Sequence, residues 1–303
     1  MQIHFKSYAD LNSDINKNFD KISGDWDLVV GIPRSGMIPA YIISLALNIN
    51  CTDIASLVSN LPLKRGVTRD LKKNITHPWD AKRILLVDDS ILSGESLRKE
   101  MEPIPVFLKN RVTTLAIYSN KPVRKDIDIV LEFVPLPRVF EWNIFHHKIV
   151  EGACVSLEGV ISIDKINNKP LMLMKPRYLP SGKIHTIVSC RPASQREEVV
   201  SWLTMNGINF SNLVMVSDDV DFDSLDDFSK SKIKSDAFQS SSAFLYIEGN
   251  SEQAKMINKE SNKPVYCQAS SQIYNPGVSL EYKEMKALGK LLIWKLLNLR
   301  SRS

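Results

Sequence analysis

The 303-residue chain is poor in cysteine and histidine, with 4 and 5 residues respectively, and it has no long apolar run. Its cysteines form no Cys-x-x-Cys pair and have no histidine at ligand spacing, which disfavours a zinc site and a disulfide framework. We expect the four thiols to behave as small apolar side chains. No segment reaches the roughly 18 apolar residues that a membrane-spanning helix needs. The opening residues, MQIHFKSYADLN, have no basic segment followed by an apolar one, so we expect a cytoplasmic protein.

The sequence also lacks a strong excess of either charge. Its 39 Lys and Arg residues against 34 Asp and Glu residues give a net charge of +5. This value suits an anionic substrate such as a phosphate ester, although an ordinary solvated surface would give it equally well. It is far from the dense basic surface of a nucleic-acid-binding protein, so we expect no nucleic-acid partner. An apolar content of 44% over this length allows two domains, each with its own core.

Short apolar strands alternate with helical segments along most of the chain, which predicts an α/β fold with mostly parallel sheets. We expect two domains, 1–150 and 151–270, followed by a C-terminal amphipathic helix within 271–303, after the turn signal Asn275-Pro276-Gly277. The predicted strands are Trp26–Val30, Ile84–Val87, Thr113–Tyr118, Ile129–Val134, Ala153–Leu157, Ile184–Ser189, Leu213–Val216 and Ala243–Ile247, with a helix at Gln195–Asn206.

The segment from Ile84 to Ser96 is the most informative part of the sequence. An apolar strand leads into two acidic residues, Asp88 and Asp89, followed by a Ser/Gly turn and a helix that begins near Ser96. Open α/β sheets bind ligands at the carboxyl ends of their strands, and such a turn can direct N–H groups at a phosphate. Two adjacent carboxylates suit the vicinal hydroxyls of a ribose, so the segment indicates a ribose 5-phosphate ligand. The predicted ligand-binding turn consists of Ser90, Ile91, Leu92, Ser93, Gly94, Glu95 and Ser96.

This pattern resembles the motif with which type I phosphoribosyltransferases (PRTases) bind phosphoribosyl pyrophosphate (PRPP). The resemblance implies that residues 1–150 bind PRPP together with Mg2+, and that Asp88 and Asp89 hold the ribose and reach the metal only through the substrate. It further implies that pyrophosphate leaves the anomeric carbon with inversion, which gives a β-linked product. The alternative, a strand that ends in a solvated Asp-Asp turn, accounts for less of the pattern.

Two further segments fit the same resemblance. Gly31-Ile32-Pro33-Arg34-Ser35-Gly36 follows another strand and corresponds to the loop that holds the leaving pyrophosphate. There Arg34 would bind phosphate by a charge-assisted fork, beside the backbone N–H groups near Pro33, Ser35 and Gly36. The basic stretch 60–73, with Arg65 and Arg69, corresponds to a mobile lid that excludes water, although a solvated basic loop is an equal alternative.

The acceptor is specified less well than the donor. PRTases that salvage 6-oxopurines usually have an acidic residue three positions after the second aspartate, and this chain has Leu92 there, which disfavours that activity. Residues 135–147 are rich in aromatic and polar side chains. Phe140 and Trp142 are candidates to stack on a nucleobase or a sugar, and Glu141 and His146 are candidates for the general base. An interface between the two domains is the alternative role of this segment.

Residues 151–268 resemble a small haloacid dehalogenase (HAD)-like phosphatase by the order and spacing of several weak motifs. The positions that correspond to its site are Ser156, Glu158, Ser189, Lys232 (or Lys234) and Glu248. Such phosphatases need an aspartate nucleophile and an aspartate acid, and this chain has Ser156 and Glu158 there. A serine without a neighbouring base does not attack phosphorus, and the metal site has lost much of its negative charge. We therefore predict a catalytically inactive domain.

A type I PRTase fused to such a domain resembles proteins of bacterial surface-polysaccharide clusters. The resemblance implies transfer of ribofuranosyl 5-phosphate to a sugar hydroxyl of a glycan, free or lipid-linked, and a separate phosphatase that then removes the phosphate. Two alternatives stay open, namely purine or pyrimidine salvage and a PRPP-sensing regulatory protein. No helix-turn-helix is evident, which disfavours the regulator.

The C-terminal segment carries one apolar stripe flanked by basic residues. Its members between Tyr282 and Leu299 are Met285, Leu288, Leu292, Leu296 and Leu299, with Lys283, Lys286, Lys290, Lys295, Arg300 and Trp294 around them. Such a helix can lie on the anionic inner face of a membrane. It more often packs on its own protein or in a homo-oligomer interface, and both alternatives stay open.

Overall fold

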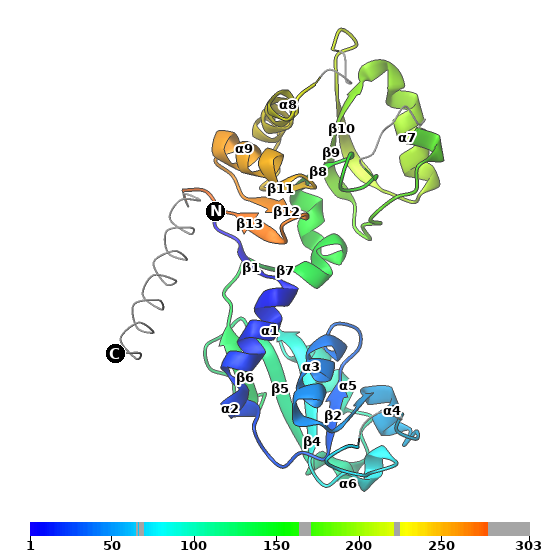
Figure 1. Ribbon diagram of the computed structural model, residues 1–303, viewed down its shortest axis with the longest axis vertical. Helices are drawn as coiled ribbons and strands as arrows, with labels where there is room; N and C mark the ends of the chain where they lie inside the picture. The colour runs from blue at the N-terminus through cyan, green and yellow to red at the C-terminus, as the bar shows by residue number, and fades with distance from the viewer. Residues whose placement is uncertain (65, 67–69, 164–170, 221–224, 278–303) are drawn as a thin grey trace, which may run out of the picture. The chain divides into compact units, whose positions relative to one another are not determined.

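The computed structural model describes residues 1–64, 66, 70–163, 171–220 and 225–277 (Figure 1). These residues form two compact units. The first is His4–Ile144, and the second consists of Met1–Ile3 and the described residues from Phe145 onward. Arg65, Arg69 and the stripe from Tyr282 to Leu299 lie outside the described residues.

A five-stranded parallel sheet is the centre of the first unit, in the order β3-β2-β4-β5-β6. The strands are β2 (Leu28–Gly31), β3 (Asn50–Asp53), β4 (Ile84–Ile91), β5 (Val112–Ser119) and β6 (Ile129–Phe133). Both faces of the sheet are buried, so the central strands are continuous apolar runs and do not alternate with polar residues. The predicted α/β class with a parallel sheet is confirmed for this unit.

Helices cover both faces of this sheet (Figure 1). They are α1 (Tyr8–Lys17), α2 (Phe19–Ile22), α3 (Met37–Leu47), α4 (Ile54–Val58), α5 (Glu95–Met101) and α6 (Val106–Lys109), with a 3-10 turn η1 at Pro78–Asp80. Side chains of α1, α2 and α3 form one core with Val29 and Leu85, whereas α4, α5 and α6 form the other with Val30 and Leu86. A separate parallel pair, β1 (His4–Lys6) and β7 (Arg138–Phe140), joins the two ends of the unit.

The second unit contains a six-stranded sheet in the order β10-β9-β8-β11-β12-β13. Its strands are β8 (Ala153–Ser156), β9 (Ile184–Pro192), β10 (Phe210–Val216), β11 (Leu245–Glu248), β12 (Val265–Cys267) and β13 (Gln272–Tyr274). The first five are parallel, and β13 is antiparallel to β12. Strand β13 lies within 271–303, where the sequence predicted only a helix. The order of the parallel strands reverses between β8 and β11, which is where such sheets bind ligands.

Three longer helices belong to this sheet, namely α7 (Arg196–Met205), α8 (Asp227–Ser240) and α9 (Ser251–Ser261). Four 3-10 turns lie around it, namely η2 (Glu141–His146, which begins in the first unit), η3 (Lys148–Gly152), η4 (Leu171–Leu173) and η5 (Ala193–Gln195). Helices α8 and α9 pack on the sheet through Phe238, Ala254 and Ile257. Helix α7 buries Val199, Trp202 and Leu203.

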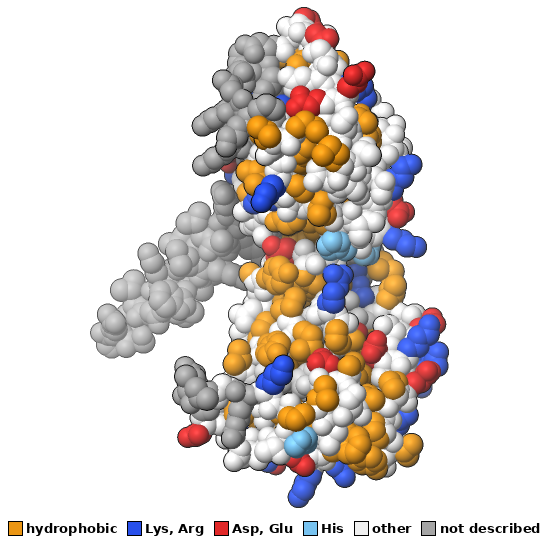
Figure 2. All heavy atoms as spheres, turned by 90° about the vertical axis from the view of Figure 1, so that its right-hand side faces the viewer, with side chains coloured by type: hydrophobic (Ala, Val, Ile, Leu, Met, Phe, Trp, Pro, Cys, Tyr) orange, Lys and Arg blue, Asp and Glu red, His pale blue; other side chains and the backbone are white. Residues whose placement is uncertain are grey.

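The state of the thiols and the distribution of surface charge fit what the composition indicates. All four cysteines are free thiols, three of them buried and Cys51 half-buried. On the face drawn in Figure 2, basic side chains stand singly or in small groups among acidic and apolar ones. None of the described helices is long and apolar enough to cross a membrane.

Candidate functional site

Two neighbouring strands of the first unit end beside each other and bring the two predicted loops together. Gly31 at the end of β2 pairs with Val87 in β4. The loop after β2 and the acidic pair of β4 are therefore adjacent, and Ser35 Oγ donates a hydrogen bond to Asp89 Oδ1 at 2.7 Å. Trp142 Nε1 donates to Asp89 Oδ2, also at 2.7 Å. Asp89 is only 3% exposed, and each of its oxygens keeps a second lone pair for a ligand hydroxyl.

Asp88 has a different environment from its neighbour. Its Oδ1 accepts the Asp89 N–H at 2.9 Å, and no Lys, Arg or His forms an ion pair with it in the described residues. Burial, helped by the nearby charge of Asp89, raises the pKa of Asp88 to about 8. A divalent cation would favour its ionised form, so this carboxyl fits the surroundings of a substrate-bound Mg2+. Among the described residues, no cluster of three or more His, Cys, Asp or Glu side chains is arranged to hold a metal.

The turn after β4 requires glycine at its centre. Gly94 has φ of +88°, and a Cβ there would collide with Asp126 Oδ2. Ser93, Glu95 and Ser96 are exposed, and the Glu95 N–H donates to Ser93 Oγ at 3.2 Å. Helix α5 begins at Glu95, one residue before the predicted start.

Two arginines that the sequence analysis did not identify donate hydrogen bonds to backbone carbonyl groups at the start of this turn. Arg124 Nη1 donates to the carbonyl oxygen of Leu92 at 2.7 Å, and Arg138 Nη2 donates to that of Ile91 at 2.8 Å. The Arg124 guanidinium also forms two hydrogen bonds to Asp126. Both arginines follow later strands, so no pattern near the motif could have identified them.

The loop after β2 is compact and leaves its arginine accessible. The Pro33–Arg34 peptide bond is cis. A Cβ at Gly36 would lie 2.6 Å from the carbonyl oxygen of Ile32 and 2.8 Å from that of Val87, so this position also requires glycine. Arg34 is exposed and forms no ion pair with any described residue. It is therefore available to an anionic ligand.

The acceptor-side candidates separate into different roles. Phe140 is 8% exposed and contacts the rings of Tyr118 and Trp142, at centroid distances of 5.2 and 5.1 Å. It is part of the buried core of this unit, and stacking on an acceptor stays a prediction. Trp142 is half-buried and touches Asp89. Glu141 accepts the Tyr8 N–H at 2.8 Å.

The last of these candidates, His146, belongs to the second unit. There its Nδ1 lies 3.2 Å from Ser181 Oγ. Of the two candidates for the general base, Glu141 therefore lies in the first unit and His146 in the second.

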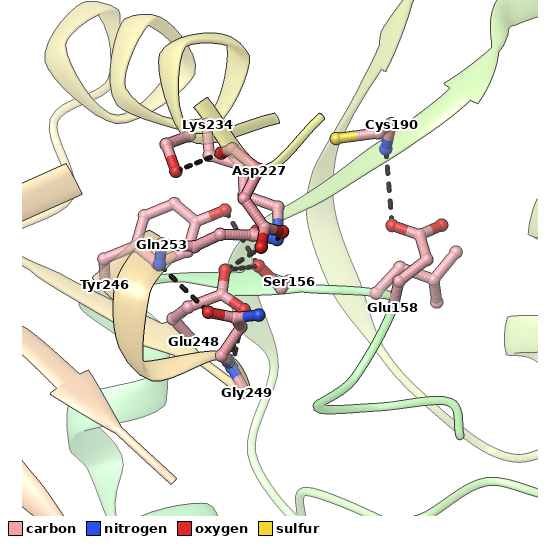
Figure 3. A network of polar contacts seen from close by, with 12 residues as sticks. Ser156, Glu158, Cys190, Asp227, Lys234, Tyr246, Glu248, Gly249 and Gln253 are labelled. Atoms are coloured by element: carbon pink, nitrogen blue, oxygen red, sulfur yellow. Dashed lines mark hydrogen bonds and ion pairs between the residues drawn. The ribbon is translucent and has the colours of Figure 1, made fainter. Parts of the chain in front are cut away.

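A buried polar cluster lies at the reversal point of the second sheet (Figure 3). Glu248 Oε2 accepts hydrogen bonds from Ser156 Oγ at 2.7 Å and from Lys234 Nζ at 2.8 Å. Its Oε1 accepts the N–H groups of Gly249 and Asn250 at 2.7 and 3.0 Å. Burial alone would lower the pKa of Lys234, but the charge and hydrogen bond of Glu248 and the other nearby acidic groups together raise it above its ordinary value. Both carboxylate oxygens of Glu248 are thus bonded to protein donors, one of which is the buried cation of Lys234.

The remaining cluster residues are equally enclosed. Glu158 Oε1 accepts from Ser189 Oγ at 2.6 Å, and its Oε2 accepts the Cys190 N–H at 3.3 Å. Arg191 Nε lies 3.4 Å from Glu158 Oε1. A Cβ at Gly249 would collide with the backbone of residue 159, so these two loops nearly touch.

Of the two lysines predicted for the cluster, the structure places only Lys234 there. Lys232 is exposed and pairs with Asp236 at 3.0 Å and Glu260 at 3.6 Å. Lys234, two residues further along α8, is 3% exposed and contacts Glu248 and Gln253. An offset of two residues moves a side chain to the opposite side of a helix, which explains why only one of the two reaches the cluster.

Residues 2–146 match the family model of the phosphoribosyl transferase domain. Similar solved structures include the xanthine-guanine-hypoxanthine phosphoribosyltransferase of Helicobacter pylori, 19% identical over 47% of this chain and 95% of that one, with a TM-score of 0.35. A purine phosphoribosyltransferase from Pyrococcus horikoshii is 18% identical over 47% and 94%, with a TM-score of 0.33. A hypothetical protein from Neisseria gonorrhoeae with bound ppGpp is 15% identical over 47% and 89%, with a TM-score of 0.32.

Proposed function

Because residues 2–146 match the family model of the phosphoribosyl transferase domain, we propose that the chain transfers ribosyl 5-phosphate from PRPP to a sugar hydroxyl of a bacterial surface glycan. The observation that supports the binding of PRPP, the donor, is that three features lie together at the ends of β2 and β4. These are the acidic pair Asp88 and Asp89, the loop with the exposed Arg34, and the turn around Gly94. Together they offer one partner for each part of PRPP.

In this proposal each group of the donor has its own partner. The 5-phosphate binds the N–H and hydroxyl groups of residues 92–96, and the ribose hydroxyls bind Asp88 and Asp89. Arg34 and the backbone N–H groups of residues 33–36 hold the pyrophosphate and stabilise its charge as it leaves. Mg2+ bound with the substrate would supply further charge neutralisation. The acceptor oxygen attacks the anomeric carbon from the opposite face, the bond to pyrophosphate breaks, and the acceptor proton passes to a base.

The second unit is proposed to be a HAD-like domain without catalytic activity. Its parallel strands have the order 3-2-1-4-5 along the chain, and the corresponding site residues Ser156 and Glu248 end the two strands at the reversal point. Ser156 is fully buried and bonded to Glu248 and Tyr246, so it has no free base and no access to a substrate. The product would therefore keep its phosphate until a separate phosphatase removes it.

The decisive experiment incubates the full chain with PRPP, Mg2+ and either nucleobases or a lipid-linked oligosaccharide, and measures pyrophosphate release. We expect release with the oligosaccharide only, and none in the Asp88→Ala and Asp89→Ala variants, which should remain folded. Release with a nucleobase alone would support salvage instead. PRPP binding without release in any mixture would support a sensor. Inorganic phosphate release that disappears in Ser156→Ala would overturn the inactivity of the second unit.

A further inference from the structure

Arg138 is a buried cation with one unused donor group. Its side chain is 8% exposed, and its Nη2 donates to the carbonyl oxygen of Ile91 at 2.8 Å. Its Nη1 is buried and has no hydrogen-bond partner among the described residues. Over the same residues, no carboxylate lies within 4.0 Å of the guanidinium. A buried guanidinium without an anion and with an unpaired donor is unfavourable in a protein that binds nothing there.

The position of Arg138 places this donor at the candidate site. Ile91 is the last residue of β4, directly before the turn proposed to bind phosphate. The guanidinium lies over the ring of Phe140 at 5.3 Å, in the segment that also carries Trp142. Asp89 interacts with it electrostatically without contact. The guanidinium therefore contacts the residue directly before the turn and belongs to segment 138–142, which reaches Asp89 through Trp142.

Arg124 shows what a purely structural arginine looks like in the same turn. It holds the neighbouring carbonyl oxygen, that of Leu92, as Arg138 holds that of Ile91. However, its guanidinium is also paired with the carboxylate of Asp126 and with Asn120 Oδ1. Support of a turn therefore does not require a guanidinium without an anion.

We propose that Arg138 is a specificity-determining residue that binds a carboxylate oxygen of the acceptor. This inference rests on the proposed function, in which the phosphates of PRPP already have partners at Arg34 and at residues 92–96. Arg138 comes instead from the acceptor-side segment, so the anion that it lacks belongs to the acceptor. Nη1 is covered in the ligand-free protein, so acceptor binding includes a rotation of this side chain or of a neighbour such as Trp142.

Calorimetry with matched probes tests the proposal. The full chain is saturated with Mg2+ and pyrophosphate and titrated with methyl galacturonide against methyl galactoside, and with orotate against uracil. Each pair differs by a carboxylate. We expect the wild type to bind at least one carboxylate probe about tenfold more tightly than its neutral partner, as for one charge-assisted hydrogen bond. Arg138→Gln should abolish this preference and Arg138→Lys should keep part of it, whereas Mg2+–PRPP binding should weaken in Arg138→Gln no more than in Arg124→Gln, because each arginine holds one carbonyl group of the same turn.

Arg124→Gln is the matched control, because it loosens the same turn without touching the unpaired donor. It should weaken PRPP binding and leave the carboxylate preference unchanged. A wild type that binds PRPP but shows no carboxylate preference overturns the inference, and this readout needs no variant to fold. A preference that persists in Arg138→Gln, or that is lost equally in Arg124→Gln, also overturns it. A wild type that does not bind PRPP at all refutes the proposed function itself.

Discussion

The indole N–H of Trp142 donates to Oδ2 of Asp89 over 2.7 Å, although the two residues are 53 positions apart in the chain. The ring is itself held by a parallel stack on Phe140, with 4° between the two planes. Since Ser35 occupies the other carboxylate oxygen, two separate loops fix the orientation of Asp89. A carboxylate held in this way needs little reorganisation when a ribose binds.

The hydrogen bond from Trp142 can be removed without removing the stack. Trp142→Phe should weaken Mg2+–PRPP binding by about tenfold, because a hydrogen bond to a charged group contributes about 1.5–3 kcal/mol and only part of it affects binding. Ser35→Ala should have an effect of similar size. Affinity for pyrophosphate alone should stay unchanged in Trp142→Phe, since that ligand does not reach Asp89. Calorimetry checks both, and a loss of pyrophosphate affinity in Trp142→Phe would point to general damage of the site.

Asp88 should make stability depend on pH in a direction unusual for a carboxyl group. Its pKa is raised from the ordinary 3.8 to about 8, so between these values the folded protein keeps a proton that the unfolded chain has lost. This contribution to the free energy of unfolding is complete below pH 4 and declines as pH rises toward 8. Urea titrations between pH 5 and 8 measure the free energy of unfolding of the wild type and of Asp88→Asn. The wild-type value minus the variant value should fall as the pH rises. Parallel curves for the two proteins would contradict the assignment.

Gly94→Ala should damage the phosphate-binding turn specifically. The positive φ costs about 1–2 kcal/mol for an alanine, and the new Cβ would also displace Asp126. We expect a loss of PRPP affinity of more than about tenfold. Gly207→Ala is the control, because Gly207 also has a positive φ, of +68°, but no atom within 4 Å of the added Cβ. It should lower stability and leave PRPP binding intact; equal losses of affinity in both variants would refute the role of the turn.

Lys234→Met should destabilise the protein by about 3–5 kcal/mol, because it leaves Glu248 charged and buried without a cation. The double variant Lys234→Met/Glu248→Gln should recover part of this loss. Lys232→Met, in the same helix but exposed, should leave the free energy of unfolding nearly unchanged. Urea titration measures all three. Comparable losses for the two single lysine variants would show that the buried cluster does not need its cation.

The donor side of the site was predictable because its residues are local in sequence. The strand, the acidic pair and the glycine turn occupy consecutive positions, and their ligand-binding geometry follows from the end of one parallel strand. The partners of the motif were not predictable. Arg124 and Arg138 reach it from 32 and 47 positions away, and no periodicity encodes a side chain that returns from a later strand.

The missed strands have a similar cause. Strand β3, with the sequence Asn-Cys-Thr-Asp, lies at the edge of its sheet and is too polar and short to be recognised. Strand β4 extends four residues past Val87, because Asp88 to Ile91 pair with β5 despite their polarity. In both cases the neighbouring strand, and not local propensity, decides the conformation.

The pairing of Ile3 with Asn275 constrains the order in which the protein can be completed on the ribosome. The Ile3 N–H donates to the Asn275 side chain at 2.9 Å, and that side chain donates back to the Ile3 carbonyl at 3.1 Å. The two residues are 272 positions apart, so at 5–20 residues per second roughly 15–55 s separate their synthesis. The first unit can fold during this interval, before the partner of Ile3 has been synthesised. Cutting the chain between the units therefore cannot release the second one intact, since the segment that carries Ile3 would leave with the first.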